Sequence, residues 1–314
     1  MNTVALYVGD ALGRYGFPQG HPFGPDRQLA FWSETQTQGL DRSVELREPV
    51  MARTAELERF CEPGFVSFVQ ERSERGSGFF DYGDTPVFSG AFEAASNVAG
   101  SALDGLRLIM ERQVRRTFQP IGGLHHARRG SAAGFCIFND TGVVIEALRA
   151  EYGIKRIAYV DIDVHHGDGV FYSYESDPDI VIVDSHQDGR TLYPGTGHAH
   201  ETGAGAAKGT KLNIALRPGA GDEEFLSEWG PALRFLRAFD PEFVLLQCGA
   251  DSIAGDPLAM LRLSPAAHAR VARDLCGLAQ DCSQGRIMGF GGGGYNRRNL
   301  ALGWNAVLKA FLET

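Results

Sequence analysis

The sequence predicts an α/β fold: a single domain, residues 1–314, with a mainly parallel central sheet flanked by helices. Three observations support this prediction. Short runs of β-branched and apolar residues recur along the chain, and such runs are typical of strands buried on both faces of a sheet. Longer amphipathic segments alternate with them, as expected when helices connect parallel strands. The composition does not shift along the chain, which favours one domain.

The expected strands lie at residues 4–8, 156–160, 180–183, 212–216, 243–248 and 287–290. The expected helices lie at residues 91–116, 141–152, 223–239, 265–280 and 297–312. Asp222 and Ser264 stand at N-cap positions, and Pro265 follows as a first helical residue. Residues 10–90 are less regular and rich in Gly, Pro and aromatic residues, so we expect surface loops and short helices that shape a rim there.

The composition disfavours several classes of protein. With 43% hydrophobic residues, a chain of 314 residues can bury a full core and is not disordered. No apolar stretch approaches the roughly 18 residues of a membrane span, and the N-terminus lacks the pattern of a secretory signal. We therefore expect a cytoplasmic protein. Five cysteines without a CxxC pair indicate no disulfide framework, and a net charge of −9 disfavours nucleic-acid binding.

Polar side chains with chemical capability follow several of the expected strands. They are Asp161, Asp163, His165 and His166 after the strand at 156–160, Asp184 and His186 after 180–183, Asp251 after 243–248, and Tyr295 after 287–290. In open parallel sheets, ligands bind beyond the carboxyl ends of the strands. We therefore expect the active site at this edge of the sheet.

A metal site is the first chemistry that this pattern predicts. Asp163 and His165 are two residues apart, so in an extended chain their side chains share a face. A carboxylate and an imidazole suit zinc or iron, and Asp251 is the candidate for a third ligand. Three protein ligands leave a position for water, as in catalytic sites. Taken alone, the DxH pair would be better explained as a hydrogen-bonded turn.

The motif GGLHHARRG places two histidines, His125 and His126, in one loop. Each needs a partner that fixes its tautomer, and Asp161 and Asp168 are available carboxylates. Taken alone, the pair would be read as solvated loop histidines. The motif FGGGGYN permits a close backbone approach and presents Tyr295, whose phenol can donate to an oxyanion. The alternative is a tight turn with a core tyrosine.

Two other motifs lack function on this interpretation. Residues 203–210, GAGAAKGT, resemble a phosphate loop, but the order Lys-Gly-Thr misplaces the lysine, so we expect a flexible loop or hairpin. Cys136 in GFCIFND has no visible activating group, and we interpret it as a small buried residue.

Taken together, the motifs GGLHH, GFCIFND, YVDIDVHHGDG, YPGTG, GADSIAGDP and GFGGGGYN resemble the zinc-dependent histone deacetylase superfamily. They occur in that family's order and approximate spacing, from about His21 to the C-terminus. GGLHH followed by GFCIFND looks most like the bacterial acetoin-utilisation branch. The resemblance implies the arginase/deacetylase fold and an N-acetyl-lysine deacetylase.

The resemblance also implies roles for individual residues. It implies zinc ligands Asp163, His165 and Asp251, tandem histidines His125 and His126 with carboxylate partners Asp161 and Asp168, and the catalytic Tyr295. The implied substrate contacts are Gly134, Phe135, Tyr193 and Leu258 in the acyl-lysine channel and Asp84 at its rim, with Arg27 in an internal channel. A structural potassium site is implied near Asp161, Asp163, His165, Asp184 and Ser185, where Asp184 replaces a common serine.

The mechanism expected is hydrolysis by a metal-activated water, with His126 as general base and acid and Tyr295 as oxyanion donor. Zinc is the expected metal, with iron as an alternative in the cell. The substrate is an acetyl-lysine protein or peptide, or alternatively an acetylpolyamine or another small acylated amine. A binuclear manganese hydrolase and a non-catalytic acyl-ligand binder are less favoured, because no DxHxD ligand set is present and no catalytic group is missing. The sequence leaves the oligomeric state open.

Overall fold

The computed structural model describes residues 4–17 and 20–314, so residues 1–3 and 18–19 of the N-terminal stretch considered above lie outside it. The strands are β1 Val4–Tyr7, β2 Glu45–Arg47, β3 Arg116–Gln119, β4 Ile157–Asp161, β5 Ile180–Gln187, β6 Lys211–Leu216, β7 Phe243–Gln247 and β8 Ile287–Phe290. The helices are α1 Asp10–Gly13, α2 Arg27–Thr37, α3 Thr54–Leu57, α4 Pro63–Arg75, α5 Ala91–Met110, α6 Asp140–Tyr152, α7 Asp168–Ser173, α8 Asp222–Phe239, α9 Pro265–Cys282 and α10 Arg297–Glu313. Short 3₁₀ turns are η1 Leu40–Ser43, η2 Gly205–Ala207 and η3 Ala250–Ser252.

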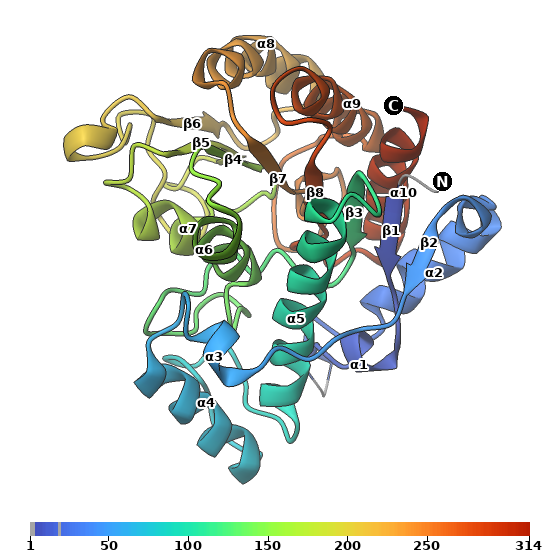
Figure 1. Cartoon of the computed structure of the whole chain (residues 1–314), viewed down its shortest axis with the longest axis vertical. Helices are drawn as coiled ribbons and strands as arrows, with labels where there is room; N and C mark the ends of the chain where they lie inside the picture. The colour runs from blue at the N-terminus through green and yellow to red at the C-terminus, as the bar shows by residue number, and fades with distance from the viewer. Residues whose placement is uncertain (1–3, 18–19) are drawn as a thin grey trace.

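The strands form one eight-stranded sheet in the order β2-β1-β3-β8-β7-β4-β5-β6 (Figure 1). Every neighbouring pair is parallel. This confirms the predicted α/β class. Because the strands are parallel, all their carboxyl ends lie at one edge, and the loops that follow them meet there.

Helices cover both faces of the sheet. Within β4, Tyr159 packs on one face with α4, α5 and α6, whereas Ala158 and Val160 pack on the other with α8, α9 and α10. The same alternation holds along β5, β7 and β8, whose residues are all buried. Strands buried on both sides explain why the sequence shows unbroken apolar runs rather than alternation.

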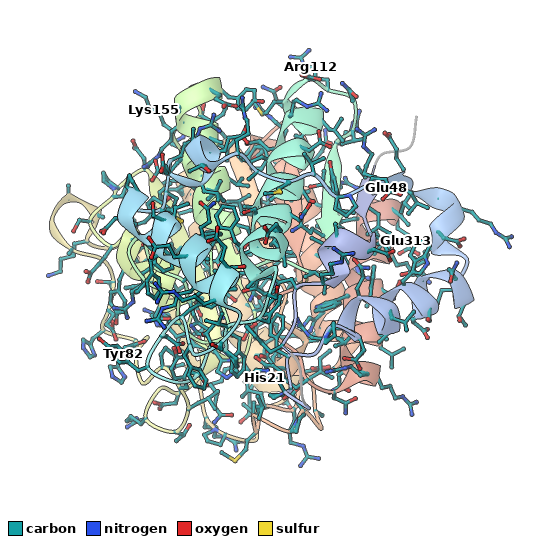
Figure 2. The ribbon with its side chains drawn as sticks, turned by 90° about the horizontal axis from the view of Figure 1, so that it is seen from below. His21, Glu48, Tyr82, Arg112, Lys155 and Glu313 are labelled. Carbon is teal, nitrogen blue, oxygen red and sulfur yellow. The ribbon has the colours of Figure 1, made fainter. Side chains whose placement is uncertain are left out.

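The loops at the amino ends of the strands and the loops at their carboxyl ends lie on opposite sides of the view from below (Figure 2). Arg112 and Lys155 mark the loops that precede β3 and β4, at the amino ends of the strands. His21 and Tyr82 lie at the opposite end of the view, with the loops that follow the strands. No helix in the described part of the chain is long and apolar enough to cross a membrane.

The predicted helix at 91–116 was wrong at its C-terminal end. The helix α5 stops at Met110, Arg112 adopts a left-handed conformation (φ 61°), and the chain re-enters the sheet as β3 at Arg116. The strand β3 pairs with β1 and β8, which are distant in sequence. Tertiary pairing therefore overrides the helical pattern of these charged residues.

Smaller differences concern short elements. The edge strand β2 was read as loop, because three partly exposed residues give no buried run. Asp222 is the first residue of α8, and the N-cap of this helix is Gly221. The Asp222 carboxylate instead accepts a hydrogen bond from the Ser264 backbone N at 2.8 Å. Ser264 does cap α9 by accepting from Ala266 N. Residues 203–210 form a loop with the 3₁₀ turn η2 rather than a hairpin, and Cys136 is buried.

Candidate active site and metal centre

The predicted site residues come together at the carboxyl edge of the sheet. Most of them lie at or beyond the carboxyl ends of five neighbouring strands, in the order β3, β8, β7, β4 and β5. The expectation that Asp184 and His186 follow their strand was wrong, because β5 continues to Gln187 by pairing with β6 and includes both. Asp161 is the last residue of β4, and Asp84 lies in the loop before α5. The loop after β3 carries the tandem histidines, the loop after β8 carries Tyr295, and β7 leads to Asp251. The loop after β4 carries Asp163 and His165.

Asp163, His165 and Asp251 form a buried group whose ligand atoms all lie within 4.8 Å of one another. His165 Nδ1 lies 3.1 Å from Asp163 Oδ1 and 3.2 Å from Asp251 Oδ2. Apart from this approach to His165 Nδ1, buried Asp251 Oδ2 has no hydrogen-bond partner among the described residues. Two buried carboxylates and an imidazole that converge in this way offer oxygen and nitrogen donors that suit a divalent cation.

The electrostatics of this group also favour a cation. Burial, and then the charge of Asp163, raise the pKa of Asp251 to about 7. Burial alone would lower the pKa of His165, but hydrogen bonds and charge from the two aspartates outweigh it and raise the pKa to about 10. Without a metal, the two buried carboxylates therefore favour protons on His165 and Asp251, and a bound cation would take the place of those protons.

Backbone and amide donors orient the ligands. Asp163 Oδ2 accepts from Gln247 Nε2 and from Gly293 N, both at 2.8 Å. Asp251 Oδ1 accepts from Val164 N at 3.0 Å. Gln247 was not predicted as a site residue, although a polar side chain near the end of the apolar run at 243–248 was a usable signal. Partners that fix ligand geometry contribute to metal affinity.

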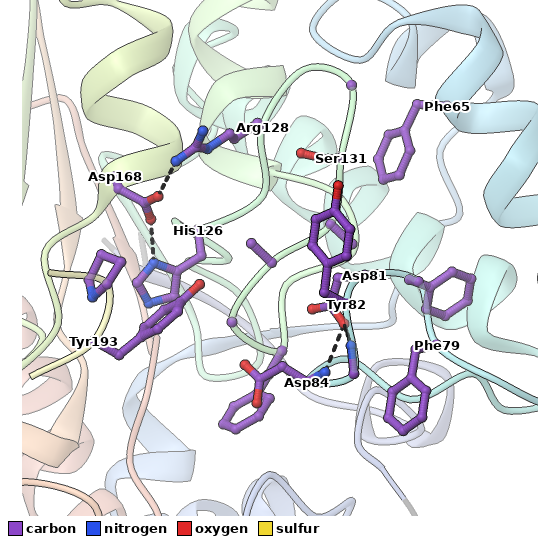
Figure 3. Close-up of a pocket in the computed structure, with 18 of the residues that line it drawn as sticks. Phe65, Phe79, Asp81, Tyr82, Asp84, His126, Arg128, Ser131, Asp168 and Tyr193 are labelled. Carbon is purple, nitrogen blue, oxygen red and sulfur yellow. Dashed lines mark hydrogen bonds and ion pairs between the residues drawn. The ribbon is translucent and has the colours of Figure 1, made fainter. Parts of the chain in front are cut away.

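The tandem histidines each have the carboxylate partner that was expected. His125 Nδ1 lies 2.8 Å from Asp161 Oδ2, and His126 Nδ1 lies 2.7 Å from Asp168 Oδ1. Arg128 donates to the other oxygen of Asp168 at 2.8 Å (Figure 3). Asp168 thus joins His126 and Arg128, and because it holds the Nδ1 of His126, Nε2 is the ring nitrogen that it leaves available.

Two partners of these pairs were missed from the sequence. Tyr159 donates to Asp161 Oδ2 at 2.6 Å, and Arg128 clamps Asp168. Asp140 was also missed; it holds the histidine loop by accepting from Gly123 N and Leu124 N, each at 2.8 Å. Arg128 stands two residues after His126, so its motif was a signal, whereas Asp140 gave none.

The two histidines have opposite charge preferences. Burial alone would lower the pKa of His125, but Asp161 and Asp163 outweigh it and raise the pKa to about 10. Burial, and then the charge of His125, lower the pKa of His126 to about 4. At neutral pH His125 is therefore a cation, whereas His126 is neutral and can accept a proton.

Tyr295 is held at the end of the glycine-rich loop. Its backbone N donates to Asp256 Oδ2 at 2.8 Å, and its ring packs edge-on against Phe135 at 5.9 Å. Buried Arg27 donates through Nε to Gly294 O at 3.0 Å and stacks on Phe23, so it supports this loop from below. Burial raises the pKa of the Tyr295 phenol well above its ordinary value, so the phenol keeps its proton.

The remaining predicted residues line one cavity of about 1120 Å³ (Figure 3). We define the tunnel as the part of this cavity lined by Gly134, Phe135, Tyr193, Leu258 and Tyr295. His126 and His165 also line the cavity, and the Tyr193 ring lies 5.1 Å from that of His126. Asp84 is exposed on the cavity wall, because the neighbouring Asp81 rather than Asp84 accepts the turn's backbone N–H groups.

The residues of the expected potassium site are also adjacent. Asp161 and Asp184 face each other in the register of β4 and β5, and Ser185 follows on β5. Asp184 Oδ2 accepts from Gly167 N at 2.8 Å, and Oδ1 lies 2.7 Å from His186 Nδ1. Both oxygens of this carboxylate therefore have protein partners.

The chain is similar to known deacetylases over nearly its whole length. The sequence model of the histone deacetylase domain matches residues 21–311. Histone deacetylase 6 of Arabidopsis thaliana is 35% identical over 312 residues, which cover 96% of this chain and 64% of that protein. The acetoin utilization protein AcuC of Bacillus subtilis (strain 168) is 34% identical over 290 residues, covering 90% of this chain and 75% of that protein.

A solved structure gives the same result for the fold. The crystal structure of the HDA15 HD domain has a TM-score of 0.91 at 28% identity, covering 99% of this chain and 88% of that one. The chain spans 64% of the length of the Arabidopsis relative and 65% of probable histone deacetylase 1-A of Xenopus laevis. The family match, the AcuC similarity and the shared fold agree with the resemblance noted in the motifs. The chain belongs to the histone deacetylase family.

Proposed function

We propose that this protein is a metal-dependent deacetylase that hydrolyses the amide bond of N-acetyl-lysine in proteins or peptides. The observation that carries the proposal is the buried Asp163, His165 and Asp251 group, placed behind a cavity that neutral His126 and Tyr295 also line. Family membership supports deacetylase chemistry.

Zinc is the metal that we propose, held by Asp163, His165 and Asp251, with iron as the alternative. The fit rests on the orphaned Oδ2 of buried Asp251 and on the mixed oxygen and nitrogen donors. When bound, such an ion supplies Lewis acidity, which polarises the amide carbonyl and makes a water molecule easier to deprotonate.

The protein's own residues would carry the proton transfers. His126, neutral and oriented through Nδ1 by Asp168, takes a proton at Nε2 and later returns it to the leaving amine. His125, charged and paired with Asp161, supplies fixed positive charge beside it. Tyr295 donates its phenol proton in a hydrogen bond to the developing oxyanion, which is worth about 3–4 kcal/mol at comparable sites.

The tunnel fits the methylene stem of an acyl-lysine side chain. Phe135 and Tyr193 supply aromatic walls, while Asp84 at the mouth can accept a hydrogen bond from a substrate backbone N–H. For potassium we propose the neighbourhood of Asp161, Asp163, His165, Asp184 and Ser185. Each oxygen of Asp184 already has one protein partner, but a carboxylate has about four lone-pair sites, so Asp184 could still contact a cation there.

The test is kcat/KM on a panel of acyl amines, with metal content measured in the same sample. The panel holds an acetyl-lysine peptide, a trifluoroacetyl-lysine peptide, acetylputrescine and acetylspermidine. Strong turnover of the peptides supports the proposal. Preference for the polyamines would instead favour a small acylated-amine amidohydrolase, and one bound metal with no turnover of any member would refute deacetylation of these substrates.

A further inference from the structure

The cavity extends beyond the tunnel into a second compartment that the proposed chemistry does not use. We call it the aromatic groove and define it by Phe65, Phe68, Phe79 and Tyr82 on one side and residues 130–133 on the other. In Figure 3, Phe65, Phe79, Tyr82 and Ser131 lie on the opposite side of the view from His126 and Tyr193. The groove and the tunnel belong to one continuous cavity of about 1120 Å³.

The aromatic wall comes from two separate elements. Phe65 and Phe68 lie on α4 and stack at 6.3 Å between ring centroids. Phe79 and Tyr82 lie in the loop before α5, and this loop is pinned by the bridge from Phe79 to Pro86. Phe79 is 45% exposed and Tyr82 is fully exposed, so neither ring is needed to fill the core. Exposed aromatic residues gathered at one cavity indicate a recognition surface.

The opposite wall consists of small residues. Residues 130–133 are Gly, Ser, Ala and Ala, and they join two successive turns, closed by the bridges from Arg128 to Ser131 and from Ala133 to Cys136. The second turn includes Gly134 and Phe135 of the tunnel. Because both sets of residues line the same cavity as the tunnel, the space between the large rings and the small side chains is continuous with the tunnel, and we call this space the slot.

The charged side chains beside the groove do not favour an ionic occupant of one particular sign. Arg72 lies over the Phe68 ring at 5.2 Å, and Glu62 lines the same cavity, so charges of both signs are present. An acetyl-lysine side chain consists of four methylenes and an acetamide, and it would occupy only the tunnel, which leaves the groove empty. In an extended peptide, successive residues are about 3.3 Å apart, so the residues beside the acetyl-lysine reach the wall next to the mouth.

We propose that the aromatic groove binds an apolar, preferably aromatic, side chain of a peptide substrate, one or two residues from the acetyl-lysine. This inference rests on the deacetylase function proposed above and names its substrate class: peptides with an apolar residue beside the acetyl-lysine. Asp84, on the wall of the same cavity, would hold the intervening backbone.

The experiment compares acetyl-lysine peptides that carry Phe or Glu at each of the two positions before and after the acetyl-lysine. N-acetyl-lysine methylamide, which occupies only the tunnel, serves as the reference substrate. Burying most of a phenylalanine side chain predicts a kcat/KM about ten-fold higher for Phe than for Glu at one position at least, expressed mainly in KM.

The variant Phe79→Ser/Tyr82→Ser removes the exposed half of the aromatic wall without touching the core. We expect it to reduce the preference for Phe to about two-fold, while turnover of the methylamide stays unchanged. Leu46→Ser on β2 is the matched control, because Leu46 is 51% exposed and lies on the far edge strand. It should retain the full preference. The slot-filling variant Ser131→Trp should give the same loss of preference as the double variant.

Equal turnover of Phe and Glu peptides by the wild-type protein would overturn the inference, and so would a preference that survives in Phe79→Ser/Tyr82→Ser. Normal turnover of the methylamide in either case would leave the deacetylase proposal intact. Better turnover of acetylspermidine than of every peptide would also overturn it. Failure to hydrolyse any substrate, the methylamide included, would refute the proposed function itself.

Discussion

Gly293 lies against the carboxylates of Asp163 and Asp251, two of the proposed metal ligands. Replacing Gly293 with alanine tests whether these residues hold the metal. An alanine Cβ at this position would lie 2.0 Å from Asp251 Oδ2 and 2.8 Å from Asp163 Oδ2, against 3.4–4 Å for ordinary van der Waals contact. Gly293 does not adopt a positive φ, so the effect of Gly293→Ala comes from the steric clash of the added methyl group and not from backbone strain.

The magnitude follows from the displacement that the methyl group forces. The Asp251 carboxylate must move by about 1.4 Å, and it is fully buried, so it cannot swing into solvent. Disturbed ligand geometry typically lowers metal affinity about 10–100-fold, and a 1 Å misplacement costs about 100-fold in rate. We expect Gly293→Ala to lose metal on dialysis against a chelator that leaves the wild type loaded, and to lose at least about 100-fold in kcat/KM.

The assay combines metal content by mass spectrometry, deacetylation rate and thermal unfolding on one preparation. Gly277→Ala is the matched control: it lies inside α9, and nothing lies within 4 Å of its added Cβ. The control should keep its metal and gain about 0.4–1 kcal/mol in stability. A Gly293→Ala protein that retained both its metal and normal kcat/KM would refute the assignment of Asp163 and Asp251 as ligands.

Three further outcomes are expected. Tyr295→Phe should lower kcat by about 100–1000-fold with metal content unchanged, and a kcat within about two-fold of wild type would remove Tyr295 from the mechanism. Because the pKa of His126 is lowered to about 4, its neutral form persists as pH falls from 7 and is lost only as pH passes through about 4. The kcat/KM measured from pH 4 to 8 should therefore show no acidic limb near 6.5, and such a limb in the metal-loaded wild type would contradict this prediction. Asn139→Ala removes the buried cap of α6, which accepts from Gly142 N at 2.8 Å and donates to Ala127 O at 2.9 Å; urea unfolding should show a loss of about 1–3 kcal/mol, and an unshifted midpoint would show that these bonds add nothing.

The sequence predicted the central strands and the meeting of Asp163, His165 and Asp251 at one place because their signals are local. The strands at 156–160 and 243–248 are buried on both faces, so their apolar runs are visible without any knowledge of their partners. Asp163 and His165 follow one such strand and Asp251 another, and parallel strands bring their carboxyl ends to one edge. Motif resemblance added the pairing of His125 with Asp161 and of His126 with Asp168.

Only the tertiary structure decided the features that depend on long-range contact. The strand β3 exists because β1 and β8 pair with it, and its own residues continue a helical pattern. The clamp of Arg128 on Asp168 and the support of Asp163 by Gln247 join residues 40 and 84 positions apart. The aromatic groove likewise needs α4, the loop before α5 and the segment 130–133 to meet. Such contacts carry no periodic signal in the sequence, because the partners share a place in space and no local pattern along the chain.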